Sequence, residues 1–101
     1  MQELSVNVKI KPGSSTFIKV INAGVYRIIA NIMSPEGNLS QTTCNVTLND
    51  QLVTTIQTSG TNGNWIKQKL VKIELEEGLY ELKLDFVKPG MQIDWIEFRQ
   101  V

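Results

Sequence analysis

Apolar and polar residues alternate along most of this chain, most clearly between Gly78 and Phe98. In its first half the apolar positions are Tyr80, Leu82, Leu84 and Phe86, with charged residues between them. A period of two gives a strand one buried and one wet face, whereas a helix would scatter these side chains. Pro89-Gly90 then interrupts the run, because proline lacks a ladder donor and glycine accepts turn dihedrals. A second apolar run follows at once, which predicts a β-hairpin.

Similar runs predict further strands, for a total of about eight, with no segment of helical period. They cover residues 4–10, 16–21, 26–32, 42–48, 52–58 and 71–75. Asn49 and Asp50 tolerate left-handed dihedrals and predict a tight turn, while residues 34–41 and 58–64 have loop composition. Many short strands with closely spaced turns indicate an all-β antiparallel β-sandwich. The expected core residues are Tyr26, Ile28, Val71, Ile73, Tyr80, Leu82, Leu84, Phe86, Ile96 and Phe98.

The overall composition fits one soluble domain covering residues 1–101, with 42% hydrophobic and 20% charged residues. Ten basic and ten acidic residues cancel, so we expect neither nucleic acid nor membrane as a partner. No apolar run approaches the roughly 20 residues of a membrane span, and the N-terminus has no signal-peptide core. The chain could equally be a segment of a longer exported protein.

Side chains suited to covalent catalysis are scarce. The sequence has no histidine and one cysteine, Cys44, which lies in an alternating run where a small buried side chain is expected. Without histidine, the usual nucleophile pairs and zinc sites are absent, which leaves carboxylate chemistry. The carboxylates fall mostly on wet strand faces and turns, where solvation is their ordinary role. We therefore expect no enzymatic activity.

Three motifs resemble, in their order, those of family 6 carbohydrate-binding modules. They are NAGVYRI at 22–28, GNWIKQKLVKIELEEG at 63–78, and the terminal hairpin ending in DWIEF at 94–98. The resemblance covers most of the chain and implies a jelly-roll sandwich that binds polysaccharide or oligosaccharide without catalysis. It further implies an accessory role beside a linked or partner glycoside hydrolase, in an extracellular or cell-surface setting.

Trp65 is the leading candidate for sugar contact. It closes a loop of small polar residues that offers little to bury it, and an exposed indole there suits stacking on a sugar ring. In the resembling family a tryptophan at this position lines the sugar cleft, and Asn64 and Gln92 would add hydrogen bonds. Thr16 stands where the family often carries a second aromatic residue. The alternative is that Trp65 caps the sandwich and the chain is a structural domain for interdomain or protein–protein packing.

Two other positions bear on ligands. Trp95 lies in the middle of a predicted strand and is expected to pack on the sheet. The resemblance also raises a structural calcium site, for which Asp94 matches the aspartate of the last strand and Gln2-Glu3 only loosely matches the N-terminal acidic pair. Calcium requires six to eight oxygen ligands. With a single clear carboxylate, we expect neither a bound metal nor another cofactor.

Overall fold

The computed structural model describes residues 5–11, 13–34, 42–58, 61–88 and 90–101, which form eight strands. These are β1 (Ser5–Val8), β2 (Ser15–Val20), β3 (Gly24–Met33), β4 (Thr42–Leu48), β5 (Gln51–Thr58), β6 (Ile66–Leu75), β7 (Gly78–Lys88) and β8 (Gln92–Gln100). No helix among these residues is long and apolar enough to cross a membrane. Several sequence-based expectations lie outside the described residues, namely those for Gln2-Glu3, Leu4, Pro12, Pro89, most of the 34–41 loop, and positions 59–60.

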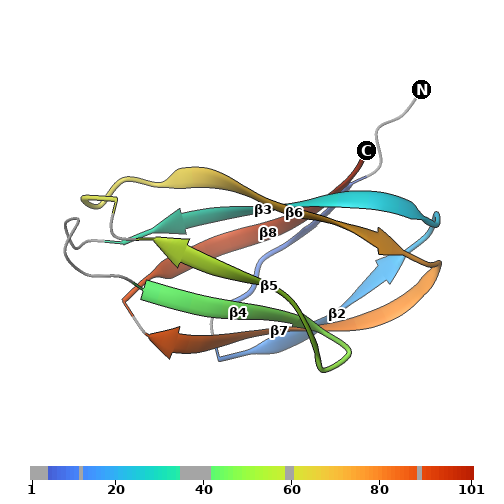
Figure 1. Cartoon of the computed structure of the whole chain (residues 1–101), viewed down its shortest axis with the longest axis horizontal. Coiled ribbons are helices and arrows are strands. Elements are labelled where there is room, and N and C mark those ends of the chain that lie inside the picture. The colour runs from blue at the N-terminus through green and yellow to red at the C-terminus, as the bar shows by residue number, and fades with distance from the viewer. Residues whose placement is uncertain (1–4, 12, 35–41, 59–60, 89) are drawn as a thin grey trace.

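The strands form two four-stranded sheets, ordered β1-β8-β3-β6 and β2-β7-β4-β5. Figure 1 shows them as two layers, with the connecting turns gathered at both ends. Antiparallel pairing joins β1 to β8, β2 to β7, β3 to β6, and β4 to β5, as in one long hairpin folded over on itself. This confirms the predicted antiparallel sandwich and its jelly-roll connectivity.

The turn at the tip of this long hairpin follows from its two residues. Asn49 and Asp50 have φ angles of 51° and 64°, the left-handed conformation that two-residue hairpins favour. The Asn49 side chain also accepts a hydrogen bond from the Glu81 backbone N–H at 2.9 Å, which fastens the turn to β7. The tight turn predicted from Asn49 and Asp50 is therefore confirmed.

The core lies between the inner faces of the two sheets. Of the predicted core residues, Tyr26, Ile28, Leu82, Leu84, Ile96 and Phe98 are buried, while Ile73, Tyr80 and Phe86 are half-buried and pack against them. Cys44 is also buried, as expected. Burial, with the nearby charge of Asp85 adding to it, raises the pKa of its thiol to about 11. The thiol therefore stays neutral near pH 7, as suits a small apolar core residue.

The prediction that Val71 belongs to the core is wrong, because β6 contains a bulge. Arg27 pairs with Lys72 whereas Ile29 pairs with Lys69, so Leu70 and Val71 together lie opposite Ile28. An extra residue shifts the alternation by one place and leaves Val71 41% exposed. The Arg27 Nη1 donates a 2.9 Å hydrogen bond to the Leu70 carbonyl, which satisfies an acceptor beside the bulge.

Truncation of two apolar residues on β6 tests which of them points into the core. Leu75→Ala should lower the free energy of unfolding by about 2–5 kcal/mol, because a buried side chain leaves a cavity. Val71→Ala should change it by less than about 1 kcal/mol, because its side chain already contacts water. Urea unfolding of the two variants measures both values. Equal losses would show that Val71 is packed in the core.

Candidate functional site

Trp65 follows a tight turn at the end of the sandwich where β3, β5 and β7 finish. Asn62 and Gly63 have φ angles of 53° and 78°, and the Asn64 N–H donates a 3.0 Å hydrogen bond to the Thr61 carbonyl. An Asn-Gly pair adopts these left-handed dihedrals at low cost. The turn brings the chain directly into β6 and leaves the Trp65 side chain 47% exposed.

The turn before Trp65 is held by the buried residue Ser34, which follows β3. The Ser34 N–H donates to Thr61 Oγ1 at 2.9 Å, and the same hydroxyl donates back to the Ser34 carbonyl at 3.0 Å. The Gly63 N–H also donates to that carbonyl, at 2.9 Å. Because these bonds join residues far apart in sequence, they position the Trp65 turn against the end of β3.

A pocket of about 310 Å³ lies beside Trp65. It brings together two of the predicted site residues, Trp65 and Gln92, and its lining is completed by Lys11, Phe86, Met91, Ile93 and Asp94. The volume is at the lower end of the range for small-molecule sites, about 300–1,000 Å³. An exposed indole with apolar neighbours, an amide, a carboxylate and an ammonium group can contact both the C–H face and the hydroxyls of a sugar.

The other two predicted site residues do not line this pocket. Asn64 is exposed next to Trp65, and Thr16 is half-buried on β2, where it pairs with Leu82. The sequence analysis missed Lys11, Met91 and Ile93. It considered Asp94 only as a calcium ligand and assigned Phe86 to the core alone. Phe86 does pack against the core, but it also forms a wall of the pocket. Met91 follows the Pro89-Gly90 interruption, the only local signal that could have drawn attention to it.

A bulge in β8 shapes the pocket on its other side. Asn31 pairs with Trp95 whereas Ile32 pairs with Ile93, so Asp94 is the extra residue. The shift places Asp94 at the pocket and turns Trp95 toward the outer face of its sheet. There Trp95 is half-buried, with the Lys67 Nζ 6.0 Å from the ring centroid. Trp95 therefore packs on the sheet, as expected, and does not line the Trp65 pocket.

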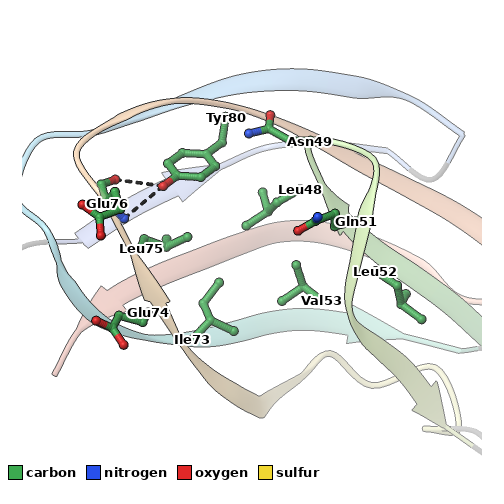
Figure 2. A pocket seen from close by; sticks show the side chains of 10 residues that line it. All are labelled: Leu48, Asn49, Gln51, Leu52, Val53, Ile73, Glu74, Leu75, Glu76 and Tyr80. Atoms are coloured by element: carbon green, nitrogen blue, oxygen red, sulfur yellow. Dashed lines mark hydrogen bonds between the residues drawn. The ribbon is translucent and has the colours of Figure 1, made fainter.

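A second pocket, of about 390 Å³, lies at the opposite end between the edge strands β5 and β6. Figure 2 shows the apolar side chains of Leu48, Val53, Ile73 and Leu75 in the gap, with polar side chains at its rim. The Tyr80 hydroxyl accepts a hydrogen bond from the Glu76 N–H and donates to the Glu76 carbonyl, both at 3.0 Å. Tyr80 is half-buried and no tryptophan lines this pocket, so it offers less exposed aromatic surface for stacking on a sugar.

The described residues do not fit a calcium site. No group of three or more His, Cys, Asp or Glu side chains among them lies close enough together to hold a metal ion. Asp94 is exposed at the pocket, and Gln2-Glu3 lies outside the described residues. The function that we propose for this chain therefore involves no calcium ion.

Comparison with known proteins gives no match to a protein-family model or to a curated protein. Among solved structures, a β-glucosidase from Paenibacillus barengoltzii is 49% identical to the chain with a TM-score of 0.88; the match covers 94% of this chain but 10% of the enzyme. The C-terminal family 6 carbohydrate-binding module of LamC, a laminarinase from Zobellia galactanivorans, matches with 20% identity and a TM-score of 0.72, over 93% of this chain and 79% of the module.

A further structure is the family 6 module CBM6cm-2 of lichenase 5A from Cellvibrio mixtus, in complex with cellotriose. Its identity is 18% and its TM-score 0.69, over 99% of this chain and 86% of the module. The chain thus has the fold of family 6 carbohydrate-binding modules, as the resemblance predicted. It matches such modules over most of their length, whereas it spans only about a tenth of the β-glucosidase.

The Thr61 hydroxyl provides a test of the link between the turn and Trp65. Thr61→Val should lower the free energy of unfolding by about 1–3 kcal/mol, because it leaves the Ser34 N–H without its partner. Thr61→Ser keeps the hydroxyl and should retain most of the stability. Thermal and urea unfolding measure both, and an unchanged Thr61→Val variant would show that the turn does not depend on these bonds.

Calcium should have little effect on stability. A site filled at 100 times its dissociation constant would add about 2.7 kcal/mol, or several degrees of melting temperature in a domain of this size. We expect melting curves recorded with a chelator and with millimolar calcium to coincide nearly. A shift of more than a few degrees would reveal a site involving residues outside those described.

Proposed function

We propose that the chain is a non-catalytic carbohydrate-binding module whose sugar site is the pocket at Trp65. The observation that carries this proposal is a half-exposed indole at the rim of a pocket that also presents Gln92 and Asp94. The fold adds support, because the family 6 modules that it matches include one in complex with cellotriose.

Stacking on Trp65 supplies the apolar part of the binding energy. A pyranose ring has an apolar face of C–H groups, and burying such a surface on an indole is worth roughly 1.5–3 kcal/mol. Phe86, Met91 and Ile93 extend the apolar surface beside the indole. They take the place of the second aromatic wall that Thr16 does not provide.

Hydrogen bonds to the sugar hydroxyls supply orientation. Gln92 offers an amide donor and acceptor, Asp94 accepts, and Lys11 donates. The rim of the pocket can therefore both donate hydrogen bonds to sugar hydroxyls and accept hydrogen bonds from them. Asn64, exposed beside Trp65, can reach a sugar residue that extends past the pocket. All these groups are open to water, so each bond adds little net affinity.

The module would act as part of a longer protein. The similar region of the β-glucosidase is a tenth of that enzyme, which favours an accessory domain that keeps an attached or partner glycoside hydrolase near its polysaccharide. The family resemblance implies that such a module acts outside the cell or at its surface.

A structural role, in packing against a neighbouring domain, is the second candidate. It is favoured by the open apolar pocket between β5 and β6, with Leu52 exposed at its edge. In that case Trp65 would contribute to stability or to a protein interface and would bind no sugar. The two proposals differ in what happens when the indole is removed.

Calorimetric titration with soluble β-glucan, xylan and agar oligosaccharides tests the sugar site. At least one should bind with a dissociation constant between millimolar and tens of micromolar, about −4 to −6 kcal/mol. Trp65→Ala should abolish this binding and leave the melting temperature nearly unchanged, because the indole is half-exposed. Gln92→Ala should weaken it by about 1 kcal/mol, the net worth of one hydrogen bond.

Phe17→Ala is the matched control, because Phe17 is also an exposed aromatic side chain but lies outside the Trp65 pocket. This variant should bind the same oligosaccharide with unchanged affinity. If no sugar in the panel binds, and Trp65→Ala costs the ~3–5 kcal/mol typical of a buried tryptophan, the structural role is correct instead.

A further inference from the structure

The outer face of the β3, β6 and β8 strands carries an unusual concentration of positive charge. Cross-strand partners share a face, so the registers define three rows: Lys72, Arg27 and Arg99; then Lys69, Ile29 and Glu97; then Lys67, Asn31 and Trp95. We call these three rows the cationic face. Figure 1 shows the three strands within one layer of the sandwich.

The charge on this face departs sharply from that of the whole chain. The chain has ten basic and ten acidic residues, yet the three rows hold five of the former and one of the latter, Glu97. Glu74, opposite Val25, borders the face where β6 ends. A molecule without net charge thus presents one strongly positive sheet surface.

The first row is unfavourable in the isolated protein. Lys72, Arg27 and Arg99 are direct cross-strand neighbours, and like charges so placed destabilise a sheet. The bulge in β6 creates this arrangement, because it puts Lys72 on the same face as Lys67 and Lys69. Local charge repulsion that internal contacts compensate only in part is expected where function requires it.

Internal contacts use only part of this charge. Arg99 pairs with Glu97, with Nη2 to Oε1 at 3.0 Å, and Arg27 donates to the Leu70 carbonyl. Within the part of the chain that the structure describes, neither Lys69 nor Lys72 takes part in a salt bridge, and both are exposed. A hollow of about 250 Å³ lies among Arg27, Lys69, Lys72 and Arg99, with Ile29 in its lining.

We propose that the cationic face binds an acidic polysaccharide, independently of the Trp65 pocket. Successive rows lie about 7 Å apart along the strands, so the cations form a track along which a linear polymer with repeated anionic groups can lie. The anions would occupy the hollow among the four cations and relieve the repulsion of the first row. Trp95, half-buried in the third row, can contact the next sugar unit of the polymer with the exposed part of its ring.

A protein or a nucleic acid is a poorer match. Protein interfaces have an apolar centre in which lysine is depleted, whereas Lys67, Lys69 and Lys72 are exposed on this face and its central residue, Ile29, is buried. Nucleic acid needs a broad basic surface, whereas these three rows contain Glu97 and are bordered by Glu74. A hydrated glycan of moderate charge density suits a narrow positive track.

The test uses the full chain carrying Trp65→Ala, which removes the indole of the proposed sugar site. Polygalacturonate is the probe. Affinity electrophoresis and calorimetry should detect binding at 50 mM NaCl that weakens about twentyfold at 200 mM, as expected when about three anions of a single-stranded polymer are neutralised. Adding Lys69→Gln and Lys72→Gln should weaken binding at least tenfold and reduce its salt dependence. The same substitutions should raise the melting temperature at low salt, because they relieve repulsion.

Lys9→Gln with Lys19→Gln is the control, because it makes the same change in net charge at exposed positions outside the face. It should leave polygalacturonate binding nearly intact. The proposal is overturned by absence of binding at 50 mM NaCl, or by equal losses in the two double variants. It is also overturned if polyglutamate or duplex DNA binds as tightly as polygalacturonate under the same conditions.

Discussion

Burial of one face of each central strand is the interaction on which the other features of this structure depend. β3 and β8 lie at the centre of one sheet and β4 and β7 at the centre of the other. Inner-face residues such as Ile28, Phe98, Val46 and Leu84 are fully removed from water. Each such side chain contributes about 1.5–3 kcal/mol through the hydrophobic effect. With the core supported in this way, the turns and outer faces can carry residues that add no stability.

The part of the fold predicted from sequence is the part that period-two alternation encodes. Alternation identified the strands and most of the core because burial of one face requires it. It could not reveal bulges, since an inserted residue such as Asp94 has no distinctive side chain. Val71 was misassigned for this reason, as it keeps the right spacing from Ile73 and Leu75 but lies beyond the point where the phase changes.

The candidate site was predictable only where the signal was local. Trp65 stands out because a large apolar side chain follows an Asn-Gly turn, and Gln92 entered through the family resemblance. Lys11 reaches the same pocket from a distant part of the chain, whereas Phe86 and Met91 belong to the β7–β8 hairpin that also carries Gln92. The approach of Lys11 and of this hairpin to Trp65 depends on how the strands pack, and the side of the hairpin that borders the pocket depends on the β8 bulge. Thr16 was placed by counting from a motif, and that count says nothing about which face of a strand borders the pocket.

The bulge in β6 has a consequence for how this strand can change in evolution. Side chains along a strand point alternately to its two faces, and one extra residue reverses this alternation for every residue that precedes it. Lys67 and Lys69 are odd-numbered and Lys72 even-numbered, yet all three point the same way. Regular pairing without the bulge would reverse this alternation and send Lys67 and Lys69 inward, whereas deletion of Val71 would remove the bulge and keep the lysines on their present face. Insertions and deletions elsewhere in β6 reverse the faces of one of its segments, so the length of this strand is constrained everywhere except at the bulge.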